Sequence, residues 1–213
     1  MSDLLDLYDY RIRVFAMYRV RNRAILAGEN AEVVCNNFRA ARDELFASHP
    51  QSALDEDQRA RFEGLRYFPY NPSLRVAAEV DRRVEPEVLT VPKNAEESMT
   101  MTRVALLHFT LAGQQAALAM YWLNIYGGGL FLPFRDTSSP AQSYGGGRYL
   151  FDTIKGSDFL RPAGATDLER IVLDFNYAYN PSCAYNSRWV CPLAPVENRL
   201  NIAITAGEQN FSH

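Results

Sequence analysis

The N-terminal part of the chain repeats apolar side chains at intervals of three and four residues, which is the period of a helix with one buried face. Leu4, Leu7 and Val14 follow this spacing and Gly28 is a suitable C-terminal cap, so a helix is predicted over 3–27. Two further helices are predicted, one with Asn30 as its N-cap and one short, over 30–47 and 54–63.

From about residue 74 the pattern changes to short apolar runs separated by turns rich in Gly, Pro, Asn and Asp. The segment Ala112-Gly113-Gln114 predicts a hairpin turn between two such runs. Because no long helix interrupts the series, parallel crossovers are not expected and the strands form an antiparallel meander. Strands are predicted at 74–81, 87–91, 99–111, 115–123, 129–134, 143–152, 170–177 and 198–205.

These patterns predict a mainly β fold of the α+β class, an antiparallel β-barrel or sandwich-like meander with N-terminal helices packed against it. The length of 213 residues suits one domain with an appendage. Residues 29–213 are therefore expected to form a single β-rich domain, with helices over 30–63 and strands from about 74 onward. Residues 1–28 form an N-terminal helical extension, which we expect to join protomers.

Net charge limits the classes of partner. At −3 the chain has no global basic field to attract nucleic acid. The first residues are acidic, unlike a secretory signal, and no stretch approaches the roughly 20 apolar residues of a membrane span. The sequence therefore predicts a cytoplasmic protein with neither nucleic acid nor membrane as partner. An odd number of cysteines, Cys35, Cys183 and Cys191, argues against a disulfide scaffold.

Tyr144 and Arg148 are spaced to share one face of a predicted strand. A guanidinium on a strand that lines a barrel must meet an anion. Two interpretations remain open at this point. The anion belongs either to a small ligand or to a carboxylate of the protein, such as Asp174, Glu197 or Glu208.

Asp174 and Asn176 share the polar face of the strand predicted over 170–177, where they can hold one ligand group or satisfy the loop that follows. Pro181 stiffens the next loop, which carries Asn180 and Tyr185. Such a loop suits the rim of a pocket, and it equally suits a plug at one end of a barrel.

Cys183 and Cys191 lack the two-residue spacing of thiol redox pairs and zinc knuckles. Cys183 is nevertheless a candidate nucleophile, and Asp174 with Glu197 is a candidate carboxylate pair for acid-base chemistry. The two glycine triplets lack the ending of a phosphate-binding loop. Neither a metal nor a cofactor is predicted from these patterns.

Several longer motifs carry a family resemblance. They are the run Asp-Phe-Asn-Tyr-Ala-Tyr-Asn-Pro-Ser-Cys-Ala-Tyr from residue 174, Cys-Pro-Leu from 191, Glu-Asn-Arg-Leu from 197, and the segments 134–137 and 146–150. Together they resemble the bacterial and archaeal family named domain of unknown function 1684, from about residue 31 to 209. The resemblance implies a shared fold and pocket. No activity is settled for the family, so it assigns no catalytic residue, and Pro140 departs from the family's usual turn.

The leading hypothesis is a protein that binds a small polar or anionic molecule in a β-barrel-like pocket. The candidate ligand-binding residues are Arg148, Tyr144, Asn176, Asn180 and Tyr185. One alternative is a metal-independent enzyme that uses Cys183 or the carboxylate pair of Asp174 and Glu197. The other is an oligomeric scaffold joined through the N-terminal helix.

Overall fold

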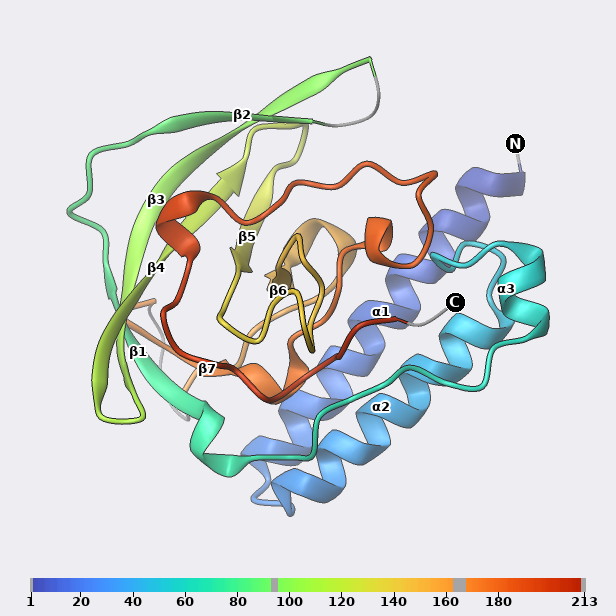
Figure 1. The fold of residues 1–213 in the computed structure, drawn as a ribbon, viewed down its shortest axis with the longest axis horizontal. Helices are drawn as coiled ribbons and strands as arrows, with labels where there is room; N and C mark the ends of the chain where they lie inside the picture. Colours follow the sequence, from blue (N-terminus) through green and yellow to red (C-terminus); the bar gives the residue numbers. More distant parts are fainter. Residues whose placement is uncertain (1, 93–95, 163–167, 212–213) are drawn as a thin grey trace.

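Two long helices lie side by side along one flank of a curled sheet (Figure 1). The computed structural model describes residues 2–92, 96–162 and 168–211. Helix α1 spans Ser2–Leu26, α2 spans Ala31–Ser48 and the short α3 spans Glu56–Ala60. As predicted, the Asn30 side chain caps α2 by accepting hydrogen bonds from two backbone amides of its first turn. Helix α3 is shorter than predicted because Asp55 starts it with a capping box.

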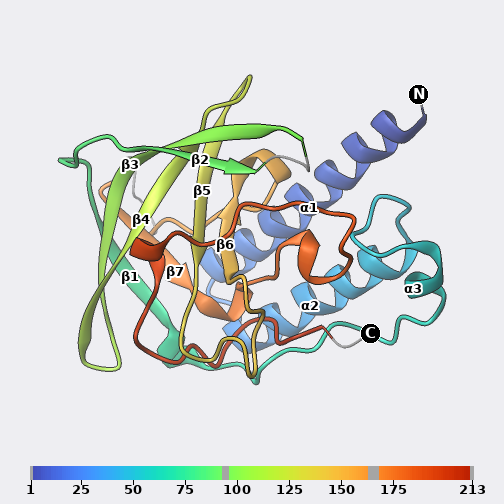
Figure 2. The same ribbon diagram turned by 45° about the horizontal axis from the view of Figure 1, so that its top comes forward.

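In the described part of the chain, seven strands form one sheet in which all the named strand pairs are antiparallel. The order is β6-β5-β4-β3-β1-β7, and β2 pairs with the part of β3 that β1 leaves free. The sheet curls into a half-barrel beside the helices (Figure 2). Its strands are β1 (Arg75–Asp81), β2 (Val88–Pro92), β3 (Ser98–Leu111), β4 (Gln114–Leu123), β5 (Gly129–Phe134), β6 (Arg148–Asp152) and β7 (Arg170–Asp174). The predicted fold class is confirmed.

Two predicted strand boundaries and one predicted strand are wrong for local reasons. Strand β6 begins only at Arg148, because Gly147 has a φ of 90° and closes a turn with Tyr144. Strand β7 ends at Asp174, whose carboxylate caps a 3-10 turn over Phe175–Tyr177. Residues 198–205 form no strand.

Asn198 explains the missing last strand. Its side chain hydrogen-bonds to the backbone of Ala119 through both amide atoms and to the carbonyl oxygen of Pro133. The segment is thus attached to the sheet by a side chain, together with one isolated bridge between Arg135 and Arg199. Side-chain hydrogen bonds replace the ladder that a strand would make.

Apolar side chains fill the inner face of the curled sheet. Leu107, Leu118, Phe134 and Phe175 are completely buried in the largest core cluster, to which every strand except β2 contributes. The sequence-based hypothesis placed the ligand inside this curl. The structure corrects that placement, because hydrocarbon occupies the space that a barrel pocket would need.

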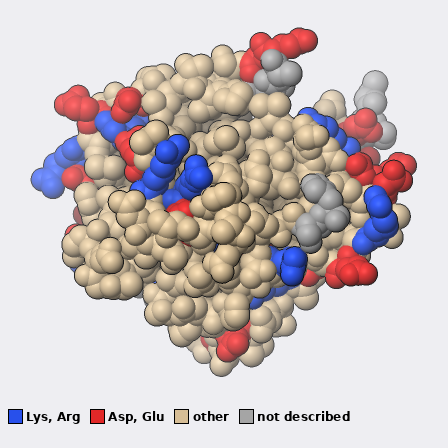
Figure 3. Space-filling view, in the orientation of Figure 1, with Lys and Arg blue, Asp and Glu red and all other residues tan. Residues whose placement is uncertain are grey.

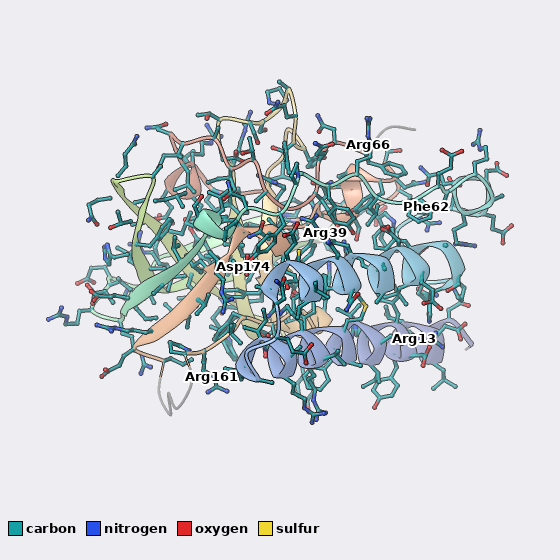
Figure 4. All side chains as sticks on the ribbon, turned by 90° about the horizontal axis from the view of Figure 1, so that it is seen from below. Arg13, Arg39, Phe62, Arg66, Arg161 and Asp174 are labelled. Carbon is teal, nitrogen blue, oxygen red and sulfur yellow. The ribbon has the colours of Figure 1, made fainter. Side chains whose placement is uncertain are left out.

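A separate cluster joins the helices to the end of β7. Val14 and Tyr18 of α1 pack there with Phe38 of α2 and with Tyr177. Figure 4 shows α1 and α2 from below, with the labelled Arg39 between α2 and the sheet, where its guanidinium approaches the carbonyl oxygen of Asn176. Helix α1 therefore shares its buried face with the remainder of the fold.

Charged side chains of both signs are scattered over the face shown in Figure 3, and neither sign forms a continuous field on it. This distribution agrees with the small net charge of −3. Within the described residues, none of the helices combines the length and the apolarity that a bilayer crossing requires.

Candidate functional site

Arg148, the first residue of β6, is 1% exposed. Its Nη2 donates to Asp136 Oδ1 at 2.9 Å and to the carbonyl oxygen of Ile204 at 2.8 Å. Its Nη1 donates to the carbonyl oxygens of Ala206 and Glu208. The guanidinium is thus paired with one carboxylate and three carbonyl groups of the protein.

This pairing makes Arg148 a structural residue. It ties β6 and the loop after β5 to the 204–208 segment, and the rings of Phe68 and Phe134 lie 5.8 and 5.2 Å from its guanidinium carbon. Burial lowers the pKa of Arg148, while the Asp136 carboxylate favours the charged form. The carboxylate expected from the sequence among Asp174, Glu197 and Glu208 is in fact Asp136.

Asn176 is likewise engaged within the protein. Its Oδ1 accepts from the backbone amide of Asn71 at 2.8 Å, and its Nδ2 donates to the Asn71 carbonyl and to Asp174 Oδ1. Asp174 also accepts from the backbone amide of Asn176. The loop-capping interpretation therefore describes these two residues better than ligand binding does.

Asp174 and Glu197 do not form a carboxylate pair. Asp174 lies at the end of β7, and its Oδ2 is 3.8 Å from Nε of Arg75. Glu197 instead accepts hydrogen bonds from Arg103 at 2.8 Å and from the hydroxyl of Tyr121. The two carboxylates have separate partners, so the structure gives no support to acid-base chemistry between them.

A cavity of about 70 Å³ lies between the two long helices and the segments that follow β6 and β7. Five of its side chains are tyrosines, which come from α1, from β6 and from residues 179–185. The lining consists of Tyr10, Val14, Tyr18, Arg42, Phe46, Ala53, Tyr149, Lys155, Ser157, Tyr179, Asn180, Pro181, Ser182 and Tyr185. Of the residues predicted from the sequence, Asn180 and Tyr185 line this cavity, whereas Arg148, Tyr144 and Asn176 do not.

A buried ion pair anchors one side of the cavity. Arg42 Nε donates to Glu208 Oε1 at 2.6 Å, with side-chain exposures of 9% and 2%. The other oxygen of Glu208 accepts from the backbone amide of Asn180 at 2.9 Å and from the Tyr185 hydroxyl. The Arg42 guanidinium also lies over the rings of Phe46 and Tyr179. The carboxylate is fully satisfied, and it fixes the cavity wall in place.

Three polar groups of the lining have unused hydrogen-bonding capacity. Within the described residues, Arg42 Nη1 and the Tyr10 hydroxyl make no hydrogen bond, since Arg42 uses only Nε and Nη2. Asn180 donates from Nδ2 to the carbonyl of Gln209 at 2.8 Å, which fixes the orientation of the amide. Its buried Oδ1 has no partner. Arg42, Tyr10 and Asn180 thus offer two donors and one acceptor to a guest.

The cavity tyrosines are held in their protonated form. Burial raises the pKa of Tyr10 and raises that of Tyr18 to about 12. Burial also raises the pKa of Tyr149, Tyr179 and Tyr185 well above the ordinary value. At neutral pH these hydroxyls are protonated and do not act as bases. Those of Tyr149, Tyr179 and Tyr185 hydrogen-bond to other groups of the protein. The Tyr10 hydroxyl is therefore the one that suits an acceptor on a guest.

The sequence patterns missed Arg42, Tyr10 and Tyr18 as site residues because all three lie on helices read only for their apolar period. One signal was present: arginine at a position that the period of α2 turns toward the core. A buried arginine requires an anion or a cavity nearby, and here both are present.

Cys183 lies beside the cavity wall without lining it. Its sulfur is 3.6 Å from the Tyr144 hydroxyl, and its backbone amide donates to Cys191 Sγ at 3.4 Å. The structure therefore brings together the predicted nucleophile Cys183, the candidate Tyr144 and the second cysteine of the motif.

A comparison with protein-family models identifies the family of this chain. The model of the family described as "Protein of unknown function (DUF1684)" matches residues 60–209. The solution NMR structure of an uncharacterized protein from Haloarcula marismortui is similar, with 35% identity, a TM-score of 0.59, and coverage of 84% of this chain and 93% of that one. A search of curated proteins gives no match. The family match begins later than the resemblance at residue 31 suggested, but it spans most of the chain, and the protein therefore belongs to the DUF1684 family.

Proposed function

We propose that this protein binds a small polar or anionic molecule in the tyrosine-lined cavity between α1, α2 and residues 149–185. The observation that carries the proposal is the pair of unused donors, Arg42 Nη1 and the Tyr10 hydroxyl, beside the cavity. A guanidinium that is desolvated and still has a free N–H group favours a carboxylate or phosphate oxygen.

The unpaired acceptor of Asn180 narrows the chemistry of the guest. Its Oδ1 suits a hydroxyl or amide donor on the same molecule. The cavity volume of about 70 Å³ is several times the roughly 10–15 Å³ that one water molecule needs. A molecule of a few non-hydrogen atoms fits, such as a short hydroxycarboxylate.

The test is a binding measurement with defined probes on the full chain. Glycolate, lactate and inorganic phosphate are the anionic probes, and glycolamide is the neutral analogue of glycolate. We expect an anionic probe to raise the melting temperature in proportion to the logarithm of its concentration, and glycolamide to do so far less. Calorimetry then gives the dissociation constant of each probe that binds.

Two variants locate the site. Tyr10→Phe removes a hydroxyl that makes no hydrogen bond within the described protein, so it leaves stability unchanged and weakens the anionic probe about tenfold. Tyr8→Phe, on the exposed side of the same helix, is the matched control and changes neither quantity. No melting shift with any anion, or equal binding by Tyr10→Phe and the native protein, contradicts the proposal.

The surface of α1 supports a second candidate, a homo-oligomer joined through this helix. Leu4, Tyr8, Ile12 and Phe15 are exposed at intervals of three and four residues, which places them on one stripe. Deleting the helix would remove the buried Val14 and would therefore confuse folding with assembly. The double variant Leu4→Glu and Ile12→Glu avoids this problem. We expect it to convert an oligomer to monomers in light scattering, and a native protein that is monomeric contradicts this candidate.

A further inference from the structure

Cys183 and Cys191 form a pair of free thiols that the proposed binding site does not use. The two residues are eight positions apart in the loop after Pro181, and the amide of Cys183 donates to Cys191 Sγ at 3.4 Å. Cys183 is partly exposed whereas Cys191 is buried. We therefore expect small reagents to reach Cys183 more easily than Cys191.

The surroundings of the two sulfur atoms make them unequal. A hydrogen bond from Cys191 lowers the pKa of Cys183 to about 6, and the Tyr144 hydroxyl and the Lys155 charge act in the same direction against burial. The hydrogen bond to Cys183, together with burial, raises the pKa of Cys191. At neutral pH the exposed sulfur is a thiolate and the buried one a thiol.

We propose that Cys183 and Cys191 are a reversible oxidation site, in which a hydroperoxide converts the two thiols to a disulfide and a dithiol reductant restores them. This inference goes beyond the binding of a small molecule and does not depend on it. It rests on the close approach of two cysteines on a single short loop, where the Cys183 amide lies 3.4 Å from Cys191 Sγ, and on their unequal burial, with Cys183 partly exposed and Cys191 buried.

The chemistry balances with one peroxide for each pair. The Cys183 thiolate attacks an oxygen of the hydroperoxide, so that a sulfur–oxygen bond forms, the oxygen–oxygen bond breaks, and the leaving alkoxide or hydroxide takes up a proton. Cys191 then attacks the sulfenic sulfur of Cys183. A disulfide forms, and the hydroxyl group departs as water with the proton of the Cys191 thiol.

The third cysteine provides an internal control. Cys35 is 0% exposed in the cluster between the helices, and burial raises its pKa to about 11. Both burial and protonation make it slow toward peroxide. Selective loss of Cys183 and Cys191 with Cys35 retained is thus the signature of the proposed site.

The experiment treats the reduced full-length protein with one equivalent of hydrogen peroxide at pH 7 and follows the thiols by maleimide labelling and peptide mass mapping. We expect two of the three thiols to disappear together, a cross-linked peptide joining Cys183 to Cys191, and complete recovery with dithiothreitol. The Cys35→Ser variant gives the same result.

Two variants separate the chemical steps. Cys191→Ser stops at the sulfenic acid, which dimedone traps at Cys183, whereas Cys183→Ser consumes no peroxide at this rate. Tyr144→Phe removes a hydrogen bond to the thiolate, so the labelling rate of Cys183 titrates at a higher pH. Intact thiols after peroxide treatment, oxidation of Cys35 at an equal rate, or disulfides only between molecules overturns the proposal. Circular dichroism of each variant shows whether it is folded.

Discussion

Arg148 and Arg42 are buried arginines that meet the C-terminal segment of the chain in different ways. Arg148 gives its terminal nitrogens to Asp136 and to three backbone carbonyls. Arg42 donates to a single carboxylate, that of Glu208, and its other hydrogen-bond partner among the described residues is the Tyr185 hydroxyl. Both terminal nitrogens of Arg148 are used, and only its buried Nε has no hydrogen-bond partner among the described residues. Arg42 keeps a terminal nitrogen unused, and it lines the cavity. An unused donor on a residue that lines a cavity, more than burial, distinguishes the candidate site.

The largest expected effect follows from replacing Arg148, whose two terminal nitrogens have four acceptors. Arg148→Met leaves the Asp136 carboxylate and three carbonyls without their donor, so we expect the free energy of unfolding to fall by about 3–5 kcal/mol. Urea denaturation measures this loss. Arg83→Met is the control, because the Arg83 side chain is 93% exposed and its loss costs less than about 0.5 kcal/mol.

If Arg148→Met does not fold, Arg148→Lys keeps the positive charge and gives a smaller loss, since an ammonium cannot reach all four acceptors. In either variant the folded fraction retains the native affinity for the anionic probe. A loss below about 1 kcal/mol for Arg148→Met, with weaker probe binding, would reverse the comparison between the two arginines.

Two buried asparagines test the same distinction with a smaller effect. Asn176 is 1% exposed with both amide atoms bonded, and Asn180 is 3% exposed with an unpaired Oδ1. We expect Asn176→Ala to lower the free energy of unfolding by about 2–3 kcal/mol, because Asn71 loses both partners. Asn180→Ala costs less than about 1 kcal/mol, since it also removes an unsatisfied acceptor. Equal losses for the two variants in urea denaturation contradict this interpretation.

Alkaline pH gives the smallest expected effect. Tyr18 holds its proton up to about pH 12 in the folded protein, but an exposed tyrosine releases it near pH 10. Its contribution to stability is therefore complete below pH 10 and is lost as pH rises toward 12. At pH 11 the raised pKa of the Tyr18 hydroxyl has lowered the free energy of unfolding by about 1.4 kcal/mol relative to neutral pH.

Urea denaturation at pH 9 and pH 11 tests whether the free energy of unfolding falls as the pH rises. The difference between the two unfolding free energies is smaller by about 1.4 kcal/mol in Tyr18→Phe than in the native protein. Tyr8→Phe, on the exposed stripe of α1, keeps the native difference. A Tyr18→Phe variant with the full native pH dependence shows that the Tyr18 hydroxyl is not protected by burial.

Local patterns predicted the parts of the fold that depend on neighbours in sequence. Asn30 caps α2 and Ala112-Gly113 turns β3 into β4, as expected from residue type alone. The prediction failed over 198–205, where Leu200, Ile202 and Ile204 alternate like a strand. Two of these side chains are buried in the core, but Asn198 supplies the contact with the sheet. Alternating apolar residues indicate which side chains are buried, but they do not show whether the backbone hydrogen-bonds to a neighbouring strand.

Of the residues that line the cavity, only those in the loop around Pro181 were predicted from the sequence. Asn180 and Tyr185 belong to the dense polar motif and line the cavity, so composition alone identified them. Arg42 and Tyr10 lie on helices far from that motif in sequence, and only the tertiary fold brings them to it. Arg148 was predicted to bind the ligand for the same reason, because no local pattern shows which anion a guanidinium will meet.

The distance along the chain between Arg42 and Glu208 also bears on how the protein is made. They are 166 positions apart, so the helical hairpin leaves the ribosome long before its counter-ion is synthesised. The carbonyls that receive Arg148 belong to the same late segment. A nascent chain that stops short of residue 204 carries both guanidinium groups in water and has no complete cavity, so the synthesis of residues 204–208 decides whether either becomes buried.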